Sequence, residues 1–349
     1  MLTPKRIFLF MVCLSLIGVS AVYIPDASAK KKKVVTIRYA TMDAKQSWTG
    51  QHSLMPWWAD VEEATNNQVK FEPYWSNTLS KPMDNWESVK SGVADAADCV
   101  MAFWPGLAPL SDVISLPFIG VESAAQGSAV FGQLYEKFPS IQAEYKDVHF
   151  MFIAVANPNV VMTVKKKVKT VDDLVGLKIR VTGGPPTSYL KSINASPMLV
   201  AMTDVYMNLQ KGVIDGVVAS WASVESMKFH ETINNIVNIP FYSPFAARVM
   251  NLNTWNRLSP EIQAAVTSQS GLERGIMFGK TQFDDHVAVV KQKGYDIEEY
   301  TPSKQELAQW QKSAEPIWQK WVADMAAKGH PEAQEILETT LDLLSKWKP

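Results

Sequence analysis

The chain has 349 residues, and its 34 Lys and Arg against 35 Asp and Glu give a net charge of −1. This balance excludes an electrostatic binder of nucleic acid, which needs a basic excess or stripe. With 47% hydrophobic and 20% charged residues the chain is an ordinary globular protein, and its length predicts two domains because a single core stops growing at this size.

The first 29 residues have the order of a secretory signal. A short positive region precedes an uncharged run over 7–23, and Ala27 and Ala29 form a small-x-small cleavage pattern. The alternative is an uncleaved membrane anchor, because the apolar run is close to the minimum length for spanning a bilayer. We predict a signal peptide over 1–29 and a periplasmic mature chain that starts near Lys30 and does not insert into the membrane.

Apolar runs in the first half of the mature chain predict strands that alternate with helices. The predicted strands are 34–40, 69–74, 96–103 and 148–155, and the predicted helices are 54–64, 84–90 and 123–145. This alternation indicates an α/β domain with a mostly parallel sheet. Cys99, the one cysteine left after signal cleavage, is predicted to be a buried thiol of the third strand.

A second α/β unit begins near Asn157. Its predicted strands are 160–164, 177–181 and 214–219, and its predicted helices are 187–193 and 204–211. The pattern over 245–251 predicts a strand that returns to the first unit. The remainder is predicted to be helical over 259–293, after Ser303 and after Pro331, with a short edge strand over 295–300. Repeated crossing between the two units favours a hinged pair that forms a cleft.

Signatures of catalysis and of cofactor binding are missing from the sequence. The five histidines show no metal-ligand spacing, and there is no G-x-S-x-G elbow. Gly183 and Gly184 precede two prolines, which removes backbone donors that a phosphate loop would use. We therefore expect a non-enzymatic protein with no catalytic residue, no cofactor and no metal site.

Arg180 is the charged residue that this plain interpretation does not explain. It lies near the carboxyl end of the strand predicted over 177–181, just before the Gly183-Gly184 turn. Ligands of open α/β sheets bind outside the carboxyl ends of the strands, and a guanidinium offers a planar fork to a carboxylate or a sulfonate. The alternatives are an arginine paired with a carboxylate of its own domain or one exposed to solvent.

Residues 173–181 (DLVGLKIRV) resemble the D-L-x-G-L-K-I-R-V segment of the solute-binding proteins of tripartite ATP-independent periplasmic (TRAP) transporters, of the dicarboxylate-binding-protein (DctP) type. Further segments are similar to this family in the same order along nearly all of the mature chain. They are 91–95 (SGVAD), 116–118 (LPF), 195–197 (ASP), 204–206 (DVY), 209–216 (LQKGVIDG), 253–255 (NTW) and 258–263 (LSPEIQ).

The resemblance implies a periplasmic-binding-protein type II-like α/β fold, with two α/β domains around a ligand cleft, hinge strands and a long bracing helix. We expect an N-terminal domain over 30–156 plus 246–284 and a C-terminal domain over 157–245 plus 285–349. The implied function is capture of a small organic-acid anion and its delivery to the small and large membrane subunits of a TRAP transporter. In this family the arginine that matches Arg180 clamps the carboxylate of the ligand.

Departures from the family pattern shape the rest of the predicted site. Many relatives carry a second cleft arginine about twenty residues before the first, where this chain has Asn159, which could donate an amide hydrogen bond or form an Asx turn. Met202 stands at a ligand-facing aromatic position of the family. Further candidate wall residues of the cleft are Trp221, Trp104, Trp48 and Gln46. For the three tryptophans, packing in the core is the alternative. One arginine with several apolar neighbours suits a monocarboxylate, a 2-oxo acid, an aromatic acid or a small sulfonate.

Two other classes of protein remain open at this point. One is an exported α/β enzyme that acts on a small organic acid, which a turnover assay would separate from a binding protein. The other is the binding component of an ABC importer or of a sensor, which the neighbouring genes for membrane subunits would separate from a TRAP system.

Overall fold

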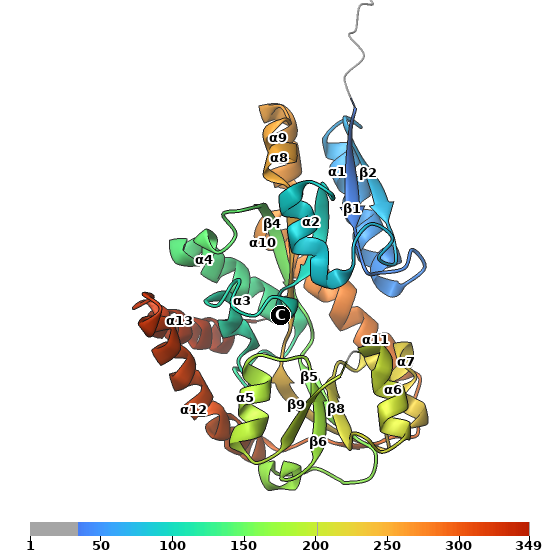
Figure 1. Ribbon diagram of the computed structural model, residues 1–349, viewed down its shortest axis with the longest axis vertical. Helices are drawn as coiled ribbons and strands as arrows, with labels where there is room; N and C mark the ends of the chain where they lie inside the picture. The colour runs from blue at the N-terminus through green and yellow to red at the C-terminus, as the bar shows by residue number, and fades with distance from the viewer. Residues whose placement is uncertain (1–33, 201, 349) are drawn as a thin grey trace, which may run out of the picture. The chain divides into compact units, whose positions relative to one another are not determined.

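The computed structural model describes residues 34–200 and 202–348 (Figure 1). The predicted signal peptide over 1–29 lies outside the described residues. Within those residues, no helix combines the length and the apolar character that crossing a membrane requires.

The first of two sheets has five strands in the order β2-β1-β3-β10-β4. They are β1 (Val35–Ala40), β2 (Val69–Tyr74), β3 (Ala96–Val100), β4 (His149–Val155) and β10 (Phe245–Met250). The first three are parallel, whereas β10 runs antiparallel to both β3 and β4. The strand predicted over 96–103 ends at Val100, because residues 101–103 form a 3₁₀ turn. An apolar run alone does not show where a strand gives way to a buried turn.

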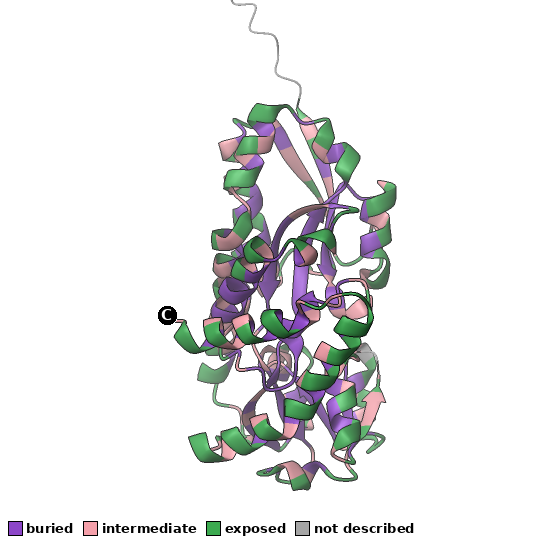
Figure 2. Ribbon diagram, turned by 90° about the vertical axis from the view of Figure 1, so that its left-hand side faces the viewer, coloured by how far each residue is buried: buried purple, intermediate pink, exposed green. Residues whose placement is uncertain are grey.

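Helices cover both faces of this first sheet. Trp57 of α1 (Met55–Ala64) and Phe278 of α10 (Gly271–Phe278) belong to the core on one face. The core on the other face takes residues from α2 (Asn85–Ser91), α3 (Ala124–Lys137) and α13 (Ala333–Lys346). Cys99 is fully buried in that second core, as the sequence predicted. Figure 2 shows the strands largely buried and the outer faces of the helices exposed.

The second sheet has six strands in the order β11-β9-β5-β8-β6-β7. They are β5 (Asn159–Thr163), β6 (Lys178–Val181), β7 (Ser196–Leu199), β8 (Gly216–Ala219), β9 (Asn235–Tyr242) and β11 (Glu298–Tyr300). Strands β8, β6 and β7 are parallel, whereas β5 runs antiparallel to β8 and β9. One strand in each sheet therefore runs against the rest: β10, which returns to the first lobe, and β5, which enters the second. The remaining strands of each sheet share one direction, as the sequence predicted for the first lobe.

Shorter helices complete the two lobes. In the second lobe they are α5 (Pro185–Ser192), α6 (Met202–Gln210) and α7 (Ala222–Ser226), and in the first they include α4 (Pro139–Ala143), α8 (Leu252–Asn256) and α9 (Pro260–Ser268). The helix predicted over 259–293 is divided, because Gly271 takes a left-handed φ of 78°. Beyond that break, α10 continues through a π-helical segment, η8 (Gly279–Asp284), into α11 (Asp285–Gln292).

One long helix, α12 (Lys304–Ala327), belongs to both lobes. Ser303 and Glu306 form the capping box at its start, as Ser303 predicted. Trp310 packs in the core of the second sheet, and Trp321 packs in the core of the first. The last helix, α13, also packs in the first core, although the sequence led us to assign 285–349 to the C-terminal domain. The domain boundaries themselves stay a prediction.

The two sheets are joined by two linkers that lie side by side. The first connects β4 to β5 and the second connects β9 to β10, and Ala156 N donates a hydrogen bond to Pro244 O over 2.7 Å. Val100 at the end of β3 pairs with Ala246 near the start of β10. Ala219 at the end of β8 likewise pairs with Val160 near the start of β5. The carboxyl ends of the parallel strands in both sheets therefore lie at this crossing.

Candidate functional site

Arg180 lies in β6, between its register partners Met198 of β7 and Val217 of β8. It is only 5% exposed. Its Nε atom donates a hydrogen bond to Val200 O over 2.9 Å, and its Nη1 atom is buried with no hydrogen-bond partner among the described residues. Because β6 is parallel to β8, this guanidinium lies near the end of the second sheet that adjoins the crossing.

The charge of Arg180 is not balanced by a carboxylate. Five arginines fall within 34–200 and 202–348, and four of them form ion pairs there, while Arg180 does not. Burial lowers the pKa of the Arg180 guanidinium, and the nearby Tyr242 opposes that change. Arginine nevertheless stays protonated in proteins. A buried, charged fork with an unused donor is the arrangement that an incoming carboxylate would complete.

Tyr242 is the neutral polar group that interacts with this guanidinium, and Thr182 and Asn159 lie beside Tyr242. Thr182 Oγ1 lies 2.7 Å from the Tyr242 hydroxyl oxygen, and Asn159 is the register partner of Tyr242 across β5 and β9. Burial raises the pKa of Tyr242, while Thr182, Arg180 and Asn159 act to lower it. Tyr242 therefore stays a neutral hydroxyl at physiological pH. The site has one permanent cation and several groups that can donate hydrogen bonds to an anion.

Two of these groups, Tyr242 and Thr182, were missed in the sequence. Tyr242 ends β9, a strand that contains Pro240 and that we did not predict. Thr182 directly follows the strand predicted over 177–181. This position is the signal from which the sequence could have identified it as a site residue.

Two candidates of the second lobe pack with its core. Trp221 is 5% exposed, donates its indole N–H to Asn238 Oδ1 over 2.8 Å, and has the Lys291 ammonium 4.7 Å from its ring centroid. Met202 is half-buried and packs against the same cluster. The contacts of Trp221 are those of the core-packing alternative, and its role in ligand binding stays a prediction.

The three candidates of the first lobe lie in different surroundings. Trp104 is half-buried beside Trp86, with ring centroids 6.5 Å apart. Trp48 is stacked between two imidazoles, those of His52 and His286, and donates its indole N–H to Thr281 O over 2.7 Å. Gln46 is exposed. None of them has a described contact with Arg180, so their ligand contacts also stay predictions.

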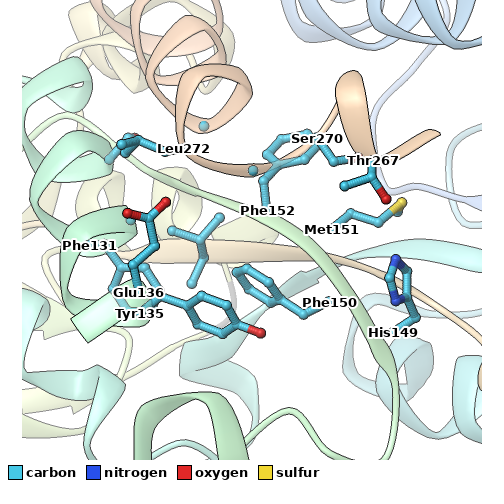
Figure 3. Close-up of a pocket in the computed structure, with 15 residues that line it drawn as sticks. Phe131, Tyr135, Glu136, His149, Phe150, Met151, Phe152, Thr267, Ser270 and Leu272 are labelled. Carbon is cyan, nitrogen blue, oxygen red and sulfur yellow. The ribbon is translucent and has the colours of Figure 1, made fainter. Parts of the chain in front are cut away.

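Two pockets lie elsewhere on the described residues. One, of about 220 Å³, lies between α3, α10 and β4, and Phe131, Tyr135, Phe150 and Phe152 are among its lining residues (Figure 3). Glu136 is the one acidic residue that lines it, and no lysine or arginine lines it. The other, of about 1030 Å³, is lined by the start of α3, by η8 and by α13. Neither pocket is lined by a predicted site residue. No group of three or more His, Cys, Asp or Glu among the described residues could hold a metal ion.

Two α/β lobes joined by crossing strands, a helix shared by both and an unpaired buried cation at the crossing define a two-lobed solute-binding protein. The sequence matches the model of bacterial extracellular solute-binding protein family 7 (DctP) over residues 40–324. The chain belongs to this family, which confirms the resemblance stated above.

Relatives and solved structures agree with this assignment. The chain is 24% identical to a solute-binding protein of Chromohalobacter salexigens, over 91% of this chain and 96% of that protein. It is 25% identical to the 2,3-diketo-L-gulonate-binding periplasmic protein YiaO of Escherichia coli, over 68% of this chain and 73% of that protein.

Among solved structures, the TRAP solute-binding protein of Rhodoferax ferrireducens with copurified benzoate has 26% identity and a TM-score of 0.81, over 90% of this chain and 98% of that chain. The TRAP periplasmic solute-binding protein of Bordetella bronchiseptica with (R)- and (S)-mandelate has 26% identity and a TM-score of 0.80, over 89% and 99%. The predicted fold class is thereby confirmed, and the chain is a TRAP-type solute-binding protein.

Proposed function

We propose that this chain captures a small organic acid with one carboxylate at the crossing between its lobes and hands it to a TRAP transporter without transforming it. The observation that carries the proposal is the buried Arg180 guanidinium, which has no ion pair and an unused Nη1 donor. A carboxylate bound there would supply the missing counter-charge. Thr182, Tyr242 and Asn159 are close enough to the same end of the sheet to add neutral hydrogen bonds.

A single carboxylate is the ligand charge that this site suits best. Arg180 is the one cation in the group described above, and the segment over 157–160 supplies no second arginine. Benzoate and mandelate, found in the two solved structures, and 2,3-diketo-L-gulonate, named for the Escherichia coli relative, each carry one carboxylate. Oxo acids and aromatic acids are therefore the first compounds to screen.

Delivery follows from how the lobes are joined. A ligand that contacts both lobes favours the closed arrangement by the difference between its affinities for the two states. We infer that the closed protein docks on the small and large membrane subunits of the transporter. We also infer that residues 1–29 direct the chain to the periplasm and are cleaved. The absence of a catalytic signature from the sequence supports binding without turnover.

The test is the replacement Arg180→Lys, which keeps the charge and removes the planar fork. Removing one partner of a buried charge pair typically costs about 2–5 kcal/mol, or about 30- to 5,000-fold in affinity, and a point charge restores only part of it. Titration calorimetry with benzoate, mandelate and pyruvate should show that Arg180→Lys loses binding of every acid that the wild type binds. Consumption of any of these acids by the purified protein would instead indicate an enzyme.

Lys178→Ala is the matched control for this replacement. Lys178 is an exposed cation on the same strand, two residues before Arg180. Its removal lowers the net charge of the strand without touching the buried fork, so affinity should stay close to that of the wild type. Equal binding by wild type and Arg180→Lys would refute the assigned site.

A further inference from the structure

The first sheet also brings a buried guanidinium close to the crossing, but this one is occupied. Arg248 of β10 is 1% exposed and is the register partner of Asp98 of β3. Its Nε atom lies 3.0 Å from Asp98 Oδ1, which is an ion-pair distance without hydrogen-bond alignment. Its Nη2 atom donates to Gln282 Oε1 over 2.7 Å, and its Nη1 atom donates to Ala246 O over 3.1 Å. The charge of Arg248 is therefore balanced by Asp98, although its Nε atom has no hydrogen-bond partner among the described residues.

Asp98 has one oxygen in use and one without a partner. Its Oδ1 atom accepts the Tyr39 hydroxyl over 2.7 Å and faces Arg248. Its Oδ2 atom is buried and accepts no hydrogen bond from the described residues, in a side chain that is 7% exposed. A buried carboxylate oxygen without a donor is costly unless a water molecule or a ligand supplies one.

A second carboxyl group lies in the loop that follows β1. The backbone of Asp43 is held at both ends, since its N–H donates to Thr41 Oγ1 over 3.1 Å and its carbonyl accepts from Ser76 N over 2.9 Å. The loop closes tightly at Gly50, where a Cβ atom would lie 2.6 Å from Ala44 O. Unlike Asp98, Asp43 keeps part of its surface exposed. Burial, and after it the charge of Asp98, raises the pKa of Asp43 to about 6.

The two lobes therefore present opposite chemistry at the crossing. Strands β1 and β3 are parallel, so Asp43 follows the carboxyl end of one and Asp98 lies near the carboxyl end of the other. Two carboxyl groups share the single, already occupied charge of Arg248. The second lobe offers the unpaired charge of Arg180.

We propose that Asp43, with Asp98 behind it, accepts a hydrogen bond from a hydroxyl group of the bound acid, so that the chain selects hydroxylated monocarboxylates and rejects dicarboxylates. This inference rests on the proposed function, because it requires the carboxylate of the ligand to bind Arg180. A ligand hydroxyl would add a donor to a pair in which Asp98 Oδ2 has none and Asp43 Oδ2 has the Thr41 hydroxyl at 3.4 Å. A second carboxylate would instead meet two carboxyl groups that share the one charge of Arg248.

Two sets of three acids test the proposal by calorimetry at pH 7.5. One set is benzoate, 3-hydroxybenzoate and isophthalate, and the other is butyrate, 4-hydroxybutyrate and succinate. Within each set that binds, the affinity of the wild type for the hydroxy acid should be at least about 10-fold higher than for the dicarboxylate. Its affinity for the unsubstituted acid should lie between these two values. Asp43→Asn should reduce that ratio to about 3-fold or less, because the amide removes the negative charge and can itself donate.

Asp112→Asn is the matched control. Asp112 is another partly exposed carboxyl group of the first lobe whose pKa burial raises to about 7, and it interacts with Lys328 rather than with Asp98. It should keep the wild-type order of the three acids.

A wild-type preference for the dicarboxylate or the unsubstituted acid, or an unchanged ratio in Asp43→Asn, would overturn this inference. The proposed function would survive that result as long as Arg180→Lys still abolished binding of every acid. Binding that is the same in Arg180→Lys, or no binding of any acid, would overturn both.

Discussion

The two buried arginines near the crossing, Arg248 and Arg180, have opposite surroundings. Arg248 has a carboxylate, an amide oxygen and a backbone carbonyl as partners. Arg180 has one backbone carbonyl and no counter-ion in the part of the chain that the structure describes. Folding alone accounts for the first arginine, because its partners belong to the same lobe. The second remains electrostatically incomplete until something outside the chain arrives, which is what a binding site requires.

The largest expected effect follows from breaking the pair in the first lobe. Arg248→Met leaves the Asp98 carboxylate buried beside Tyr39 with no cation near it. Removing one partner of a buried ion pair typically lowers the free energy of unfolding by about 3–5 kcal/mol. Urea denaturation followed by tryptophan fluorescence would measure this loss.

A double replacement keeps that prediction testable if the single variant does not fold. Asp98→Leu together with Arg248→Met removes both charges and fills the space with apolar groups, which often restores the stability of a buried pair. A double variant as unstable as Arg248→Met alone would show that the ion pair is not what stabilises this end of the sheet.

The half-buried imidazole of His149, which can lose its proton, contrasts with the two permanently charged arginines. His149 begins β4, stacks on Trp255 with ring centroids 3.5 Å apart, and has its pKa lowered by burial from 6.5 to about 4. The folded protein therefore binds this proton less readily than the unfolded chain does. Its contribution to stability is fully present above pH 6.5 and is lost as the pH falls from about 6.5 to about 4, by up to about 3 kcal/mol.

His149→Phe keeps a stacked ring and removes the titration. The free energy of unfolding, measured from pH 8 to pH 4, should fall more steeply in the wild type than in this variant. Parallel curves for the two proteins would contradict the assignment. Arg180, by contrast, does not titrate in this range, because a guanidinium does not release its proton at any of these pH values.

The strand of Arg180 was predictable from the sequence because its pattern is local. Residues 177–181 alternate apolar and basic side chains, and a Gly-Gly turn follows them, so both the strand and its carboxyl end could be located. Two other strands of the same sheet, each of which contains a proline, were not predicted. Pro197 lies in β7 and Pro240 lies in β9, and proline argues against a strand in a sequence. The sheet accepts them because β7 is an edge strand and the pairing of β9 shifts its register opposite β5.

The surroundings of the tryptophans and the pairing of Arg248 could not be predicted in this way. A tryptophan suits a core and a ligand cleft equally, so only the observed partners, such as Asn238 for Trp221, indicate which role applies. Arg248 and Asp98 are 150 positions apart in the sequence and meet only through the register of β10 on β3. Long-range pairing of this kind decides which buried charge is complete and which is available to a ligand.

The smallest expected effect concerns Arg180 itself in the absence of ligand. Arg180→Met removes a buried charge that has no counter-ion and replaces it with an apolar side chain of similar length. The free energy of unfolding of the ligand-free protein should stay the same or rise by about 1 kcal/mol, because the desolvation of the guanidinium is no longer required. Denaturation of dialysed protein that was unfolded and refolded, to remove copurified acid, measures this difference.

Arg274→Met supplies the contrast for this last measurement. Arg274 of α10 is as buried as Arg180, at 7% exposure, but it pairs with Asp60 over 2.9 Å and donates to Gln269 Oε1 over 2.6 Å. Its loss should therefore lower stability. If Arg180→Met lowers the free energy of unfolding as much as Arg274→Met does, Arg180 stabilises the ligand-free fold in the way a paired arginine does. The difference between the two kinds of arginine, and with it the argument that Arg180 awaits an anion, would then fail.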